Sequence, residues 1–211
     1  MTDPGKTDCY DVTVLRNSGL DVFSTMIKER DWSMATIPEL VANIISMHHI
    51  PLRHELERLA VVVDRLAATH QHAATTEIHK NYHSFKDALM QHLDQEEWDL
   101  FPLCIALEGA LSGRQVWKNL NVTSLIRFTS QGHTECEGGL NQLMELLQSV
   151  VTNSLDPDLT LLSDGFSAMA RDLIVHTAKE AELLLPAAIF SEELLCSRRS
   201  IEHVQGISHQ L

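Results

Sequence analysis

Histidine and glutamate side chains recur at a fixed interval along this 211-residue chain. Three of them are followed 84 residues later by an identical residue, which gives the six positions His49, His92, Glu96, His133, His176 and Glu180. Apolar residues repeat at the same interval, as Tyr82 with Phe166 and Leu89 with Leu173. A repeat of this kind predicts two similar helical hairpins related by a pseudo-twofold axis.

The spacing within each half of the repeat is suited to a metal centre. Each half offers a single His and then a His-x-x-x-Glu segment, whose i, i+4 spacing places imidazole and carboxylate on one helix face. Six polar groups inside a bundle are costly unless something compensates them, and a pair of metal ions does so. We expect two histidines per metal, with Glu96 and Glu180 as bridges. Imidazole also binds zinc, copper and nickel, so the ligands alone do not select iron.

Four amphipathic helices are predicted to position these residues. Apolar side chains at spacings of three and four mark stripes over residues 45–66, 78–107, 126–150 and 162–187, and the six polar positions fall in phase with them. Thr36 and Pro38 supply a helix start before the first stripe. Pro51 should kink the first helix beside His49. Long helices with short connections predict an all-α fold, an antiparallel four-helix bundle.

Composition and periodicity predict one folded domain with a segment at each end of it. Residues 31–190 form the predicted helical domain, residues 1–30 an N-terminal stub, and residues 191–211 a C-terminal tail in which the period is lost. The formal charge of -13 repels phosphate and anionic lipid, which argues against nucleic acid and membranes as main partners. The sequence shows no signal peptide, no membrane-spanning run and no CxxC spacing, so we expect a cytoplasmic protein with reduced thiols.

The motifs around the six positions resemble those of a known family. DWSMATIPELVANIISMHHIPLRHELERL (31–59) is similar to the opening helix of the hemerythrin-like superfamily, and specifically of its repair-of-iron-centres family. HLDQEEWDLFP (92–102) and HTAKEAELLLP (176–186) resemble that family's two His-x-x-x-Glu segments, and SQGHTECEGGL (130–140) resembles its remaining single-His helix. The resemblance covers about residues 31–190. It implies a hemerythrin-like bundle that holds two non-haem iron ions, oxo-bridged when oxidised, on the six residues.

The chain departs from the family pattern at two places. Family members commonly carry adjacent cysteines in an N-terminal module, whereas GLDVFS (19–24) has Phe23 and Ser24, so the stub resembles a degenerate form of that module. Acidic residues common near two of the histidines are replaced here by Ala88 and Gly132.

The resemblance implies a function in the repair of iron-sulfur clusters damaged by nitric oxide or oxidative stress. The protein would donate iron, and its partners would be iron-sulfur client proteins. Two alternatives stay open: a hemerythrin-like protein that binds or senses oxygen or nitric oxide, and a di-iron enzyme that reduces nitric oxide or peroxide. The sequence separates neither these roles nor the oligomeric states.

Polar residues near the six positions also need an interpretation. His48 competes with His49, but His49 shares its phase with the apolar stripe, so we expect His48 beside the ligands or on the surface. Glu137, one turn after His133, receives the same interpretation. His79 and His83 form another i, i+4 pair able to bind zinc, but no further ligand lies nearby in sequence and a solvated surface is favoured. The acidic run Asp94, Glu97 and Asp99 is predicted to face solvent.

Overall fold

The computed structural model describes residues 32–70, 72–114, 122–151 and 156–208, and every long element in these ranges is a helix. The elements are η1 (Trp32–Met34), α2 (Ile37–Ile44), η2 (Ile45–His49), α3 (Ile50–Thr69), α4 (Ala73–Gln95), η3 (Glu96–Leu100), α5 (Phe101–Leu111), α6 (Val122–Val151), α7 (Pro157–Lys179), η4 (Glu180–Leu184) and α8 (Leu185–Ser208). The N-terminal stub lies outside the described residues. The described part of the chain contains no strand, so the predicted helical fold is confirmed.

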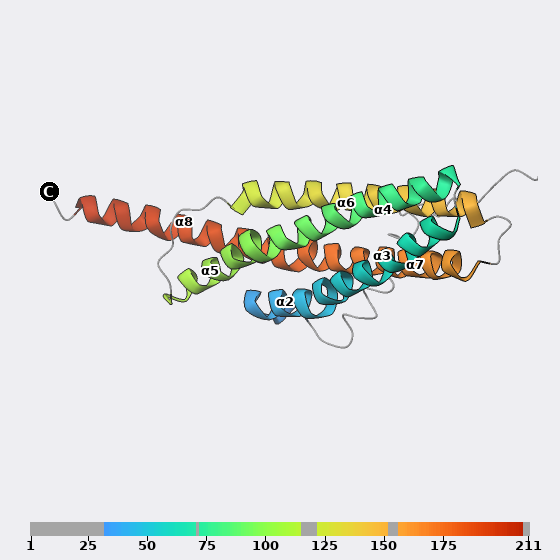
Figure 1. Ribbon diagram of the computed structural model, residues 1–211. Coiled ribbons are helices and arrows are strands. Elements are labelled where there is room, and N and C mark those ends of the chain that lie inside the picture. The colour runs from blue at the N-terminus through green and yellow to red at the C-terminus, as the bar shows by residue number, and fades with distance from the viewer. Residues whose placement is uncertain (1–31, 71, 115–121, 152–155, 209–211) are drawn as a thin grey trace, which may run out of the picture.

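The helices join into four rods that pack as a bundle (Figure 1). α3 packs against α4 and α7, and α6 packs against the same two helices, which closes a ring of four. α8 runs past the end of α6 toward the C-terminus (Figure 1). The helix α8 crosses position 190 without a break. A continuous helix does not mark a boundary between a domain and a tail, so the division at position 190 stays a prediction.

The first rod begins where the sequence indicates. The side-chain hydroxyl of Thr36 accepts a hydrogen bond from the backbone N–H of Glu39, and the Glu39 carboxylate accepts one from the backbone N–H of Thr36. This reciprocal pair satisfies donors that the first helical turn leaves free.

Three of the rods contain a π-helical turn, η2, η3 or η4, and a proline follows each turn by two residues. These prolines are Pro51, Pro102 and Pro186. Proline cannot donate the usual i→i−4 hydrogen bond, and a wider turn is a common way for a helix to absorb that loss. In the first rod the N–H of Ile50 donates to the carbonyl of Ile45, five residues back. Pro51 therefore follows a widened turn that ends at His49.

Two apolar cores fill the bundle, one on each side of the polar positions. The larger core joins α3, α4, α6 and α7, and Tyr82 stacks on Phe166 inside it with ring centroids 5.8 Å apart. These two residues are repeat partners, and residues near a pseudo-twofold axis are expected to meet in this way. The second core joins α2, α5 and α8 around Ile44, Phe101 and Leu184. Each rod thus passes from one core to the other through the region of the polar cluster.

No helix in the described part of the chain is both long enough and apolar enough to cross a bilayer.

Candidate metal centre

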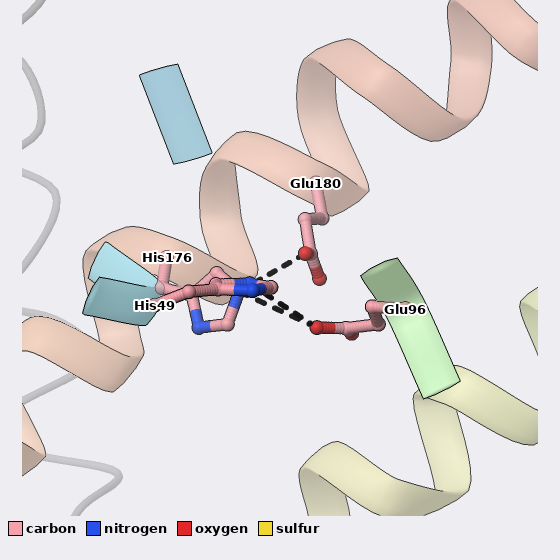
Figure 2. A group of neighbouring side chains, drawn as sticks. All are labelled: His49, Glu96, His176 and Glu180. Carbon is pink, nitrogen blue, oxygen red and sulfur yellow. Dashed lines mark hydrogen bonds and ion pairs between the residues drawn. The ribbon is translucent and has the colours of Figure 1, made fainter. Parts of the chain in front are cut away.

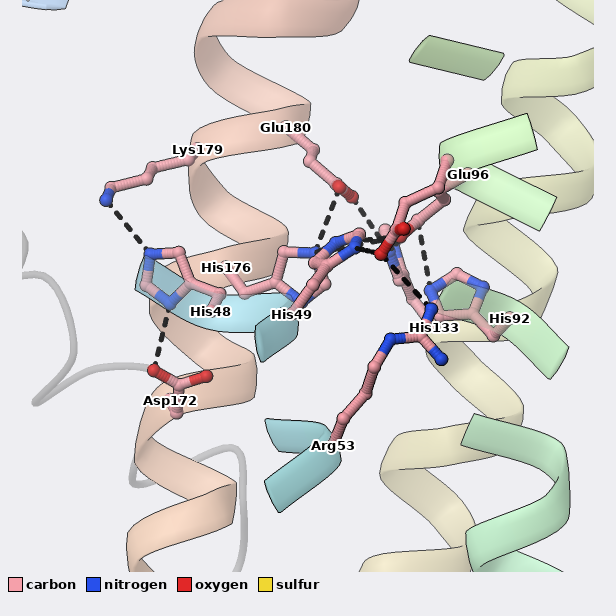
Figure 3. Close-up of polar contacts among 11 residues, drawn as sticks. His48, His49, Arg53, His92, Glu96, His133, Asp172, His176, Lys179 and Glu180 are labelled. Carbon is pink, nitrogen blue, oxygen red and sulfur yellow. Dashed lines mark hydrogen bonds and ion pairs between the residues drawn. The ribbon is translucent and has the colours of Figure 1, made fainter. Parts of the chain in front are cut away.

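All six predicted side chains meet between the two apolar cores (Figure 3). His49 ends η2, and Glu96 and Glu180 begin η3 and η4. His92 and His176 lie one turn before the glutamates, near the ends of α4 and α7, and His133 lies on α6. Every rod of the bundle therefore contributes to one cluster.

The four histidines form two pairs, and each pair joins the two halves of the repeat. Nε2 of His49 lies 3.0 Å from Nε2 of His176, and their ring centroids are 4.8 Å apart. The rings of His92 and His133 meet edge-on with centroids 4.6 Å apart. The histidines therefore pair between the hairpins rather than within one hairpin, an arrangement that the linear spacing did not indicate.

Glu96 presents one carboxylate oxygen to each histidine pair. Its Oε1 lies 3.0 Å from Nε2 of His92 and 3.2 Å from Nε2 of His133. Its Oε2 lies 3.4 Å from Nε2 of His49 and 3.7 Å from Nε2 of His176.

Glu180 repeats this arrangement from the opposite rod. Its Oε1 lies 3.0 Å from Nε2 of His176, and its Oε2 lies 3.0 Å from Nε2 of His133. Figure 2 shows both glutamates directed at the imidazole nitrogens of His49 and His176. Both carboxylates are fully buried, and each has one oxygen near each histidine pair.

Several of these atoms are buried without a hydrogen bond, although they lie close to one another. They include Nε2 of His92, Oε2 of Glu96 and Oε2 of Glu180. Buried polar atoms are normally satisfied, and each exception has a free-energy cost. Ligand atoms of His49, Glu96, His176 and Glu180 lie within 4.8 Å of one another, as do those of His92, Glu96 and His133. A metal ion is bound by several nitrogen and oxygen atoms that point to one place. These atoms do so and lack hydrogen-bond partners, so the residues fit a bound cation.

The charges in the cluster favour the same conclusion. Burial alone would raise the pKa of Glu96, but its interactions with the nearby imidazoles of His133, His49 and His92 outweigh burial and hold that pKa well below its usual range. Burial alone would lower the pKa of His133, but Glu180 and Glu96 raise it to about 10. Two buried carboxylates thus stay ionised and attract positive charge. Metal cations can supply that charge in place of protons on histidine.

Glu97 extends the cluster outward, contrary to the expectation that it faces solvent. Its Oε1 lies 2.8 Å from Nδ1 of His49, and it also accepts a 3.1 Å hydrogen bond from Arg53. Arg53 in turn donates to the exposed Asp94. The prediction was wrong for Glu97 because the first rod lies beside this face of the helix and brings His49 and Arg53 to its carboxylate. Asp99 is exposed, as expected.

His48 is buried against the ligands rather than on the surface. Its ring stacks on that of His176 with centroids 5.7 Å apart. Nδ1 lies 2.9 Å from Oδ1 of Asp172, and Lys179 donates to Nε2 over 2.9 Å. Figure 3 shows this group on the side of the cluster away from His92 and His133. His48 therefore supports His176 without reaching the converging atoms.

The two histidine pairs differ in their access to solvent. His49 and His176 are 0 % exposed, whereas His92 is 5 % and His133 is 14 % exposed. The helix backbone at Gly132 lies against the His92 ring, and a Cβ atom at Gly132 would come within 2.6 Å of Nδ1. The histidine pair between α4 and α6 is therefore the more open one.

Other candidate residues lie outside the cluster. Glu137 belongs to neither group of converging ligand atoms among the described residues. Cys104 and Cys136 are buried, and burial raises the pKa of each thiol to about 12, so both stay protonated. His79 and His83 lie elsewhere on α4, in a separate group with Asp64.

Fold and site together define a helical-bundle protein with a buried histidine and glutamate centre for metal cations. The chain belongs to the hemerythrin family, since residues 40–188 match the hemerythrin HHE cation binding domain.

Curated relatives are similar over most of the chain. The iron-sulfur cluster repair protein YtfE of Edwardsiella ictaluri is 25% identical over 186 residues, which cover 85% of this chain and 78% of that protein. The YtfE proteins of Dickeya chrysanthemi and Pectobacterium carotovorum are 23% and 25% identical, over 86% and 77% of this chain and 79% and 71% of their own lengths. The predicted resemblance to the hemerythrin-like superfamily is confirmed.

Proposed function

We propose that His49, His92, Glu96, His133, His176 and Glu180 hold two iron ions, with both glutamates as bridges. The observation that carries this proposal is the placement of the carboxylate oxygens. Glu96 and Glu180 each present one oxygen to each histidine pair, at 3.0–3.7 Å from the ring nitrogens. Two histidines and one oxygen from each glutamate would then serve each ion.

We favour iron over other metals because of the names of the curated relatives. Imidazole and carboxylate ligands also accept zinc, copper and nickel, so the donor set alone leaves these metals open. The relatives are named as iron-sulfur cluster repair proteins. When bound, iron supplies a redox-active centre with positions for small diatomic ligands such as oxygen or nitric oxide.

We further propose that the protein helps to repair iron-sulfur clusters damaged by nitric oxide or oxidants, and that it donates iron to client proteins. The names of the relatives and the site itself support this role. The proposed compartment is the cytoplasm, which the free thiols of Cys104 and Cys136 fit.

The surrounding residues hold the ligands in place for this task. Glu97 accepts a hydrogen bond from Nδ1–H of His49 and thereby directs Nε2 of His49 toward the centre. His48 stacks on His176 and is itself held by Asp172 and Lys179. His92 and His133 lie on the more open side. Iron held by this second pair should leave more readily.

Metal analysis tests the centre itself. Anaerobically iron-loaded protein should contain two irons per chain and, in air, show the absorption of an oxo-bridged diferric pair. A stoichiometry of zero or one after careful loading would contradict the proposal.

An anaerobic chelator should remove one iron faster than the other, and identical release rates for both irons would contradict the assignment of the more open side.

A repair assay tests the role. A hydro-lyase whose iron-sulfur cluster has been damaged with nitric oxide should regain activity with the iron-loaded protein, and less with Glu96→Gln protein at equal concentration. Equal recovery with free ferrous ion alone would argue against a repair function and leave the metal centre standing. Reversible oxygen binding or sustained consumption of nitric oxide would favour one of the alternative roles.

A further inference from the structure

A second group of metal-binding side chains lies on the surface of the bundle, apart from the buried centre. His79 and His83 are one turn apart on α4, and Asp64 lies opposite them on α3. Nε2 of His79 lies 3.0 Å from Oδ1 of Asp64, and Nε2 of His83 lies 2.9 Å from the same oxygen. The three ligand atoms are within 4.8 Å of one another.

The arrangement is held by the fold as well as by its own hydrogen bonds. The His79 and His83 rings meet at a centroid distance of 4.6 Å. His83 also meets the edge of Tyr82 at 5.8 Å, and the buried Tyr82 is fixed by a 2.6 Å hydrogen bond from its hydroxyl to the carbonyl of Leu56. Tyr82 thus anchors the α4 side of the group to α3, the helix that carries Asp64.

We propose that Asp64, His79 and His83 bind one divalent transition-metal ion. Two imidazoles and one carboxylate are a ligand set that suits zinc and iron(II). Because the two nitrogens already lie around one carboxylate oxygen at about 3 Å, an ion can replace the two hydrogen bonds with small movements of the side chains. The site carries one formal negative charge when both histidines are neutral. This charge neutralises half of the charge of a divalent ion.

Solvent access sets the character of this site. His79 is 42% exposed, His83 36% and Asp64 57%. Water can therefore complete the coordination, and the bound ion exchanges with solvent, unlike an ion buried between Glu96 and Glu180.

The surface site is independent of the buried one. His83 precedes His92 by nine residues on α4, which is about 13 Å along a helix axis. The two groups share no residue. The inference therefore does not rest on the function proposed for the buried centre, and either can fail alone.

A zinc titration tests the proposal. Untagged full-length protein with its buried centre loaded with iron is titrated anaerobically with Zn²⁺ by calorimetry, and bound zinc and iron are then counted after dialysis against fixed free zinc. We expect one zinc per chain with the iron content unchanged. His79→Gln and His83→Gln should each lower the affinity for this zinc at least tenfold, and Asp64→Asn should lower it as well.

A matched control uses another surface pair of the same kind. His70 is also 42% exposed, and its Nε2 lies 2.6 Å from Oδ2 of Asp156, but these two residues belong to no three-ligand group among the described residues. His70→Gln should keep the additional zinc. The proposal is overturned if the wild-type protein binds no zinc beyond the buried centre, or if His79→Gln and His83→Gln bind it as tightly as the wild type.

Cobalt(II) provides a second measurement. A bound cobalt ion should give large contact shifts for the ring protons of His79 and His83 in the NMR spectrum and much smaller shifts for those of His70, which is not a ligand. Shifts confined to other histidines would also overturn the proposal.

Discussion

At the scale of single residues, the two buried glutamates are the most informative positions to change. Glu96 and Glu180 are 0 % exposed, stay ionised, and each face both histidine pairs. Glu96→Gln and Glu180→Gln keep the volume of the side chain but remove one of the two negative charges that would hold the cations. We expect each variant to lose metal affinity by at least about 10 to 100-fold, measured by competition with a chelator.

Glu137→Gln is the control for these variants. Glu137 is on α6 one turn from His133 but outside both ligand groups, so this variant should bind the same two irons that we expect in the wild type. If both buried glutamine variants kept two tightly bound irons while Glu137→Gln lost them, the ligand assignment would be wrong.

Glu97 is a positioning residue, so its replacement should lower the metal affinity without removing a ligand. In Glu97→Gln a neutral amide replaces the carboxylate beside Nδ1 of His49, and Arg53 loses one of its two acidic partners. The variant should still reach two irons at saturation, with an affinity about 10 to 100-fold lower. Asp99→Asn, an exposed change in the same turn, should leave the affinity unchanged. Equal affinities for Glu97→Gln and the wild type would remove Glu97 from this role.

At the scale of helices, the π-turns and the close contact of α4 with α6 shape the site. His49, Glu96 and Glu180 each lie at an end of a π-turn. The His92 ring lies where a side chain at position 132 would begin, since a Cβ atom at Gly132 would come within 2.6 Å of Nδ1 and 3.2 Å of Cε1.

Gly132→Ala should therefore displace His92 and weaken metal binding. Gly138→Ala is the matched control on the same helix, because a Cβ atom there has nothing within 4 Å. The control should retain full metal content and gain up to about 1 kcal/mol of stability, since alanine favours helix over glycine. Metal content and thermal unfolding of both variants provide the test. Normal metal affinity in Gly132→Ala would show that the His92 ring moves aside freely.

At the scale of the whole molecule, the polar cluster separates two apolar cores and joins all four rods. Without metal the cluster contains buried atoms that lack partners. Metal removal should therefore lower the unfolding temperature. An ion that binds only the native state adds about 4 kcal/mol at a free concentration a thousand times its dissociation constant.

Calorimetry of the metal-free and iron-loaded protein measures this difference. In Glu96→Gln added iron should raise the unfolding temperature much less than in the wild type. Identical unfolding temperatures for the metal-free and loaded wild type would mean that the ions contribute little to the native state.

The sequence alone determined the helices, the repeat and the six candidate ligands. Helical periodicity is a local property, so a polar residue in an apolar stripe is visible without the fold. The 84-residue interval then linked His49 to His133 and both His-x-x-x-Glu segments to each other. The helical fold and the family are confirmed, whereas the ligand roles and the two irons stay predictions.

Only the tertiary structure decided which side chains face one another. The pairing of His49 with His176, the contact of Glu97 with His49 and the approach of Asp64 to His79 and His83 all join residues on different rods. Such contacts depend on which rods are neighbours and on how each rod is rotated about its axis. A π-turn widens the helix locally and so changes the rotation of the rod about its axis. The 3.6-residue period of apolar residues in the sequence does not reveal such turns.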